Sequence, residues 1–176
     1  MLVLSTIGLF FSALIMYDKI QLLLDPNFEP ACTLNSVVSC TDVMSSDQAS
    51  VFGFPNPFIG MIGFPVVMAL AVVLATGARL PRWIWLATAT GLGLGVIFVH
   101  WLAYQALYEI VALCPWCMVV WSVMLPLFVM TVVHITREVK RARGEAVAHA
   151  ILGMPLLVLV AWYLGFVVLI LDQFVF

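Results

Sequence analysis

The hydrophobic positions of the chain form long, nearly uninterrupted runs. A helix that crosses a bilayer needs about 20 mostly apolar residues. Five segments have this length and character: residues 2–24, 57–76, 83–108, 111–135 and 148–171. The pattern therefore predicts an all-α integral membrane fold with five transmembrane helices.

Composition supports a membrane protein and excludes other classes. Of the 176 residues, 65% are hydrophobic and 9% are charged, whereas a soluble domain is about half apolar and about a quarter charged. A soluble fold of this size could not hide so much apolar surface, so the excess must face lipid. The net charge is −2, and the few basic residues form no patch with interleaved aromatic side chains. We therefore expect membrane lipid, and no nucleic acid, around this chain.

The connections between the five segments differ in charge and so predict the orientation in the membrane. Residues 25–56 form a long polar loop with acidic and no basic residues. Six of the seven basic residues lie in the second and fourth connections: Arg79, Arg82, Arg137, Lys140, Arg141 and Arg143. Positively charged connections stay in the cytosol. The amino terminus is therefore expected inside, and the 25–56 loop and the carboxyl terminus outside.

The four cysteines all fall on the predicted outer side. Cys32 and Cys40 lie in the outer loop, whereas Cys114 and Cys117 form a Cys-Pro-Trp-Cys motif where the fourth helix begins. A helix N-terminus stabilises a thiolate, and cysteines three apart share one helical face. Cys117 should lie about 4.5 Å deeper than Cys114. This placement predicts a redox relay, in which the loop pair meets a water-soluble protein and the helical pair meets a lipid-soluble acceptor.

Two other interpretations of the cysteines remain open. Four cysteines could bind structural zinc, although the spacing of Cys32 and Cys40 is wider than is usual for zinc ligands. The cysteines could also form inert disulfides, an ordinary role for Cys32 and Cys40 in an outer loop. That role explains Cys114 and Cys117 poorly, because so small a closed loop stabilises little. The alternative class is thus a cysteine-stapled or zinc-binding membrane scaffold without redox turnover.

The order of the motifs resembles the vitamin K epoxide reductase family over about the first 135 residues. Cys32 and Cys40 bracket Thr-Leu-Asn-Ser-Val-Val-Ser, Asn56 opens an Asn-Pro-Phe-Ile-Gly motif, and the Cys-x-x-Cys motif comes last. The resemblance implies a four-helix transmembrane bundle around a quinone, capped by an extracytoplasmic loop. It divides the chain into a catalytic domain over 1–135 with its outer loop at 25–56, a basic cytosolic linker over 136–147, and a fifth transmembrane helix within 148–176.

The resemblance also implies roles for single residues. Cys117 corresponds to the cysteine beside the quinone ring, and Cys114 to its partner, which exchanges with the loop. Cys40 corresponds to the loop cysteine that reaches Cys114, and Cys32 to the one that receives electrons from a partner protein. Asn56 matches an asparagine that hydrogen-bonds a quinone oxygen, although capping of the second helix is the alternative.

Three further residues are implied at the quinone site. Ser46 matches a loop serine near the site, and Phe52 is expected to pack in the cap. Trp121 stands where many animal members have a tyrosine. An indole N–H can donate a hydrogen bond but cannot deliver a phenolic proton. This departure favours reduction of a plain quinone over reduction of an epoxide.

Other polar residues within the predicted helices have structural interpretations. Asp18 and Lys19 are expected to snorkel or to pair near the outer end of the first helix. His100 could relay a proton to a reduced quinone, or it could form a hydrogen bond between helices. Gly91 and Gly95 form a small-xxx-small pair that is typical of closely approaching helices.

The combined hypothesis is a thiol:quinone oxidoreductase of a bacterial plasma membrane. It would reoxidise an extracytoplasmic thioredoxin-fold protein and pass the electrons to menaquinone, ubiquinone or vitamin K. The chain stops at Phe176 after its fifth helix, so the thioredoxin-fold partner is expected to be a separate protein. The alternative within the class is an animal-type enzyme of the endoplasmic reticulum that reduces vitamin K epoxide.

Overall fold

The computed structural model describes residues 1–25, 27–78, 80–144 and 150–175. Within these ranges, five helices are long and apolar enough to cross a membrane. They are α1 (Leu2–Leu24), α3 (Pro57–Ala75), α4 (Arg82–Tyr104) with the π-helix Gln105–Ile110 that continues it, α5 (Pro115–Ala142) and α6 (Ala150–Phe174). The prediction of an all-α, multi-pass membrane protein is confirmed. Arg79 lies outside the described ranges. So do residues 145–149, where the expected linker ends and the expected fifth segment begins.

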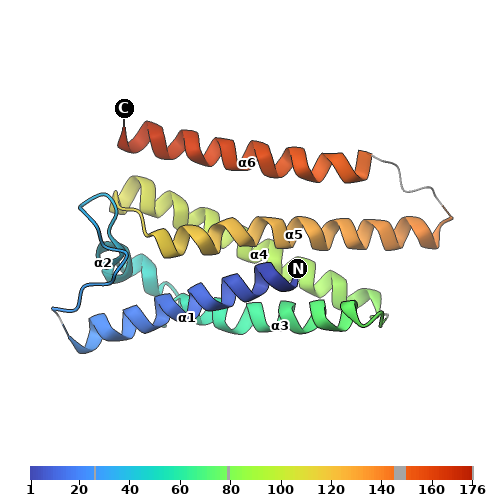
Figure 1. The fold of residues 1–176 in the computed structure, drawn as a ribbon, viewed down its shortest axis with the longest axis horizontal. Coiled ribbons are helices and arrows are strands. Elements are labelled where there is room, and N and C mark those ends of the chain that lie inside the picture. The colour runs from blue at the N-terminus through green and yellow to red at the C-terminus, as the bar shows by residue number, and fades with distance from the viewer. Residues whose placement is uncertain (26, 79, 145–149, 176) are drawn as a thin grey trace.

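Helices α1, α3, α4 and α5 run side by side as a bundle, and α6 lies along its edge (Figure 1). Helix α1 packs on α3 and α5, and α4 packs on α5. Helix α6 contacts only α5 and the π-helix closely among the described elements. Most of its large apolar side chains are exposed, which lipid accommodates because acyl chains are as apolar as leucine.

Helices α1 and α3 approach closely at two glycines. A Cβ atom on Gly8 would lie 2.3 Å from the Phe64 ring, and one on Gly60 would lie 2.2 Å from the Ser12 hydroxyl. The expected close approach at Gly95 is confirmed, since a Cβ there would meet the end of Met124 at 2.4 Å. It is wrong for Gly91, beside which the structure has open space.

The 25–56 loop folds into a cap over one end of the bundle (Figure 1). It contains the short helix α2 (Cys40–Ser45), whose N-cap Ser39 accepts a hydrogen bond from the Asp42 amide, and a 3-10 turn at Asp47–Ser50. The start of α4 and the end of α5 lie at the opposite end of the bundle. The cysteines and the basic segment that ends α5 are therefore separated by the length of the bundle.

The boundaries of the fourth predicted segment shift in the structure. The preceding π-helix ends at Ile110 and is followed by Val111, which has a φ of 54°. This left-handed conformation is rare for a β-branched residue and turns the chain sharply. Helix α5 begins only at Pro115, which suits a first helical position because no N–H is lost there. It continues to Ala142, so the expected 136–147 linker begins as helix.

Candidate active site

Three of the four cysteines meet beneath the cap. Cys32 and Cys40 form a disulfide, while Cys114 and Cys117 are free. The Sγ atoms of Cys40 and Cys114 are 3.3 Å apart. The sulfurs of Cys32, Cys40 and Cys114 all lie within 4.8 Å of one another. A thiol at Cys114 is therefore placed to exchange with the loop disulfide.

Backbone pairing between the cap and the start of α5 sets this distance. Val38 and Leu113 form an isolated parallel bridge. The Leu113 amide donates to the Val37 carbonyl at 2.7 Å, and the Ser39 amide donates to the Leu113 carbonyl at 3.0 Å. Cys40 and Cys114 each follow the paired residues directly, so the ladder holds their sulfurs together. Val38 and Leu113 are far apart in the chain, so the local sequence around either residue does not predict their pairing.

The relay cysteines are buried more deeply than expected. Cys40 and Cys114 are fully buried, and Cys32 keeps only 3% of its surface. We expected the loop pair to meet a water-soluble protein, and in the described state neither Cys32 nor Cys40 is open to one. The cause is a small apolar cluster in which Cys32 and Cys40 pack with Met44 and with Ile15 of α1.

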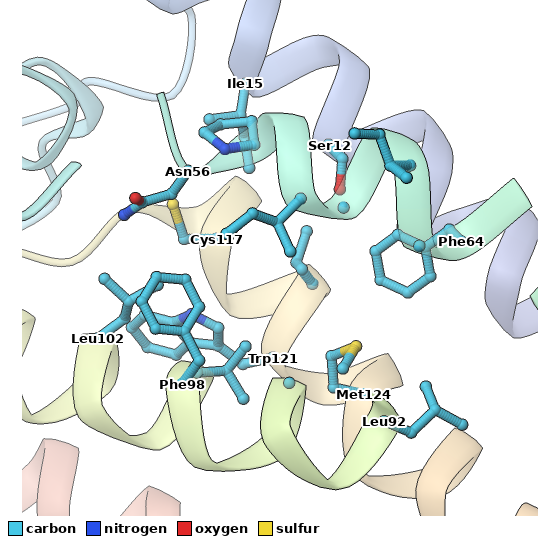
Figure 2. Close-up of a pocket in the computed structure, with 18 of the residues that line it drawn as sticks. Ser12, Ile15, Asn56, Phe64, Leu92, Phe98, Leu102, Cys117, Trp121 and Met124 are labelled. Atoms are coloured by element: carbon cyan, nitrogen blue, oxygen red, sulfur yellow. The ribbon is translucent and has the colours of Figure 1, made fainter. Parts of the chain in front are cut away.

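A cavity of about 780 Å³ lies below the cap between α1, α3, α4 and α5. Of the four cysteines, Cys117 alone lines it. Figure 2 shows the Cys117 sulfur in the cavity wall opposite Phe98, with Asn56 nearby. Cys114 caps the N-terminus of α5, and its sulfur accepts a hydrogen bond from the Cys117 amide at 3.3 Å. The Cys114–Cys117 pair thus bridges the cap cluster and the cavity.

The side chain of Asn56 lines the cavity and holds the cap, but it does not cap helix α3. Its Nδ2 donates to the Gln48 carbonyl at 2.7 Å, and its Oδ1 accepts from the Val51 amide at 3.3 Å. No side-chain cap bond is made to α3, so the alternative of helix capping is wrong. An asparagine amide has two N–H groups, and among the described residues the second has no partner.

Trp121 is 5% exposed and also lines the cavity. Its ring packs edge-on against Phe166 of α6. Within the described part of the chain, the indole N–H of Trp121 donates no hydrogen bond. Every fully enclosed side-chain nitrogen or oxygen there has a partner, so this nitrogen is not fully enclosed. The indole N–H therefore has open space beside it, as a hydrogen-bond donor to a ligand requires.

The two remaining predicted site residues differ in position. Ser46 lines the cavity, and its hydroxyl donates to the Val43 carbonyl at 2.7 Å. Phe52 is 56% exposed and does not line the cavity. Instead, it packs against Phe54 and Phe98, which do. Phe52 thus supports the cavity wall from outside.

Both ring nitrogens of His100 are occupied. Its Nε2 accepts a hydrogen bond from the indole of Trp162 in α6, so its Nδ1 carries the proton and donates to the Val96 carbonyl at 2.7 Å. His100 is absent from the cavity lining. The structure therefore favours the hydrogen bond between helices over the proton relay.

Asp18 and Lys19 of α1 do not lie as the sequence predicted. Asp18 does not snorkel, because it is 5% exposed and lies against Trp116. Lys19 lines the cavity and donates to the Met44 carbonyl. No ion pair joins the two in the described structure, where the salt bridge found is Arg141–Glu138. The position of Lys19, an ionisable residue inside a membrane helix, is the sequence feature that could have marked it as functional.

A buried disulfide, a neighbouring dithiol and an apolar cavity between membrane helices define a membrane redox enzyme. The comparison with family models agrees. The model of the vitamin K epoxide reductase family matches residues 1–132, and the chain belongs to this family, whose members act with quinones. A comparison with curated proteins finds no match to this chain.

Proposed function

We propose that this protein is a thiol:quinone oxidoreductase that reoxidises an extracytoplasmic thioredoxin-fold protein. The observation that carries the proposal is the 3.3 Å contact between Cys40 and Cys114, combined with the position of Cys117 on the cavity. One cysteine pair alone could be a structural staple. Two pairs in contact, with one of them open to a lipid-side cavity, form a path for electrons.

The path has two thiol–disulfide exchanges, followed by the reduction of a quinone. Cys32 takes the mixed disulfide with the partner's dithiol, which leaves Cys32 and Cys40 reduced and the partner oxidised. The Cys40 thiolate then attacks Cys114 of the Cys114–Cys117 disulfide, and Cys32 resolves the Cys40–Cys114 intermediate. The described state, with Cys32–Cys40 oxidised and Cys114 and Cys117 free, corresponds to the end of this exchange. The thiols of Cys114 and Cys117 then lose two electrons and two protons as their disulfide reforms. A bound quinone takes up the two electrons and the two protons and becomes a quinol.

The cavity fits a quinone headgroup. Its volume of about 780 Å³ lies within the usual range for ligand sites. Asn56 and Trp121 each offer an N–H, and the walls are otherwise mainly apolar. The lining also includes Ile62, Val66 and Trp83, whose side chains are exposed on α3 and α4. This opening toward lipid suits the isoprenoid tail that menaquinone, ubiquinone and vitamin K carry.

The orientation follows from charge. With Arg137 and Lys140 in the cytosol, the cap and all four cysteines face the outside of a bacterial plasma membrane, and the amino terminus is cytosolic. The catalytic domain would span 1–135, followed by the cytosolic linker at 136–147 and a transmembrane helix within 148–176. A thioredoxin-fold partner meets a closed cap in the described state, so Cys32 becomes accessible only when the cap shifts.

The test is quinone reduction by the purified protein with a reduced thioredoxin-fold donor. The expected result is turnover that depends on all four cysteines and is abolished in a Cys117→Ser variant. Vitamin K epoxide, offered in parallel, tests the epoxide alternative. Cysteines that stay in one redox state while quinone is added would instead indicate a structural scaffold.

A further inference from the structure

Among the described residues that line the cavity, Lys19 is the only one with a charged side chain. It projects from α1 near the cap, where its ammonium donates a hydrogen bond to the Met44 carbonyl. Ser46, Asn56 and Cys117 line the same cavity. A full positive charge therefore stands in the wall of the chamber that the reacting cysteine faces.

The ammonium of Lys19 has no counter-ion in the described structure. Its neighbour Asp18 lies against Trp116, because successive residues of an α-helix point about 100° apart. An ammonium has three N–H donors, of which Met44 uses one. Holding an unpaired cation in an apolar wall costs free energy, and such residues within membranes usually serve a function.

A structural tether for the cap does not require this charge. The Met44 carbonyl needs only one donor, which a neutral amide side chain could supply. What a cation adds is a favourable interaction with negative charge that develops nearby. Transfer of electrons from a thiolate to a quinone creates such charge on the quinone oxygens.

We propose that Lys19 is a catalytic residue of the quinone site: its ammonium offsets the negative charge that develops on a quinone oxygen and donates a proton to it. This inference rests on the proposed thiol:quinone function. As the Cys114–Cys117 disulfide forms, two electrons pass to the ring and two protons leave the thiols. Lys19 gives its proton to one quinone oxygen and is reprotonated by one of the two thiol protons. The other thiol proton passes to the second quinone oxygen, so charge and atoms balance over the cycle.

Three substitutions separate the charge from the tether. Lys19→Arg keeps the cation, Lys19→Gln keeps a neutral donor for Met44, and Lys19→Met removes both. Lys140, the only other lysine of the chain, lies at the far end of α5, and Lys140→Gln is the matched control. Loss of an electrostatic donor of this kind lowers turnover by about 10²-fold or more. Quinone turnover should therefore fall about equally in Lys19→Gln and Lys19→Met, less in Lys19→Arg, and not in Lys140→Gln.

A second readout does not depend on turnover. In a Cys114→Ser background, Cys117 is left without its partner, and its thiolate against the bound quinone should give a charge-transfer band. A nearby cation stabilises negative charge on the acceptor, so removal of Lys19 should shift this band to shorter wavelength. Exchange between the partner protein and the four cysteines, followed without quinone, should stay intact in Lys19→Gln.

The outcomes distinguish this inference from the proposed function. If the unaltered protein reduces no quinone with a reduced donor, the proposed function itself fails. If it does so, and Lys19→Gln matches it in turnover and also leaves the charge-transfer band of the Cys114→Ser protein unshifted, Lys19 is only a tether and the inference is overturned. Impaired thiol exchange in Lys19→Gln would also overturn it, because the defect would then lie in the cap.

Discussion

Cys40 and Cys114 are separated by 74 positions in the chain, yet their sulfurs are 3.3 Å apart in a fully buried contact. This contact joins the cap to the start of helix α5. A disulfide between two cysteines requires Cα atoms within about 7 Å, and the Val38–Leu113 bridge supplies this proximity without any covalent link. The backbone pairing of the cap thus sets the distance between the two cysteines of the proposed exchange.

The order of the relay can be tested by trapping. A Cys32→Ser, Cys117→Ser double variant retains only Cys40 and Cys114 and should oxidise rapidly to their disulfide, detected by mass spectrometry of non-reduced peptides. The matched Cys40→Ser, Cys117→Ser variant retains Cys32 and Cys114 and should oxidise several-fold more slowly. Equal rates in the two variants would mean that either loop cysteine can serve the internal step.

Asn56 should have a dual effect, because it holds the cap and faces the cavity. Asn56→Ala loses two hydrogen bonds to the loop, worth about 0.5–1.5 kcal/mol each, and should lower the thermal stability in detergent. It should also raise the quinone KM several-fold. Asn56→Asp keeps the acceptor for Val51 but has no N–H, so its KM should stay raised. A normal KM in Asn56→Asp would restrict the residue to holding the cap.

The indole N–H of Trp121 should contribute to quinone binding. Trp121→Phe removes the donor, and the loss of one hydrogen bond of about 0.5–1.5 kcal/mol should raise KM several-fold. Trp121→Tyr supplies an O–H and should recover part of the affinity. Steady-state kinetics with a soluble quinone analogue measure both. Identical KM values for the phenylalanine and tyrosine variants would show that ring packing, not the donor, matters at this position.

His100 should matter for stability and not for turnover. Its ring nitrogens bond Trp162 and Val96, so His100→Gln should loosen α6 and lower the melting temperature in detergent. Trp162→Phe should produce a similar loss, since it breaks the same contact. A His100→Gln protein with normal stability but turnover reduced by about 10²-fold or more, the scale of general acid–base catalysis, would reinstate the proton relay.

Gly8 should be intolerant of any side chain. A Cβ at this position would overlap the buried ring of Phe64, and overpacking of this kind costs about 1–3 kcal/mol. Gly8→Ala should therefore lower the stability of the bundle. Gly63→Ala, at a glycine of α3 with nothing within 4 Å, is the control and should leave stability nearly unchanged. Similar losses in both would contradict the close α1–α3 packing.

The sequence by itself determined the number of membrane helices and the location of the redox motif. Both follow from local rules. A span needs about 20 apolar residues, and a proline such as Pro115 is favoured at the first position of a helix. The boundaries shifted where local rules compete, as at Val111, whose left-handed turn no propensity predicts. The polar loop was also evident, because it lacks the apolar length to cross.

Only the tertiary structure decided which side chains meet in the cavity and beneath the cap. In a soluble protein, the apolar face of a helix marks the core, but in a membrane the lipid-facing side is equally apolar. The hydrophobic pattern therefore could not show that Lys19 points into the cavity or that Phe52 lies outside it. The burial of Cys32 likewise depends on packing of the cap against Ile15 of α1. Contacts between segments far apart in the chain leave no periodic signal in either segment, because each side chain's partner is chosen by how the helices and cap fit together.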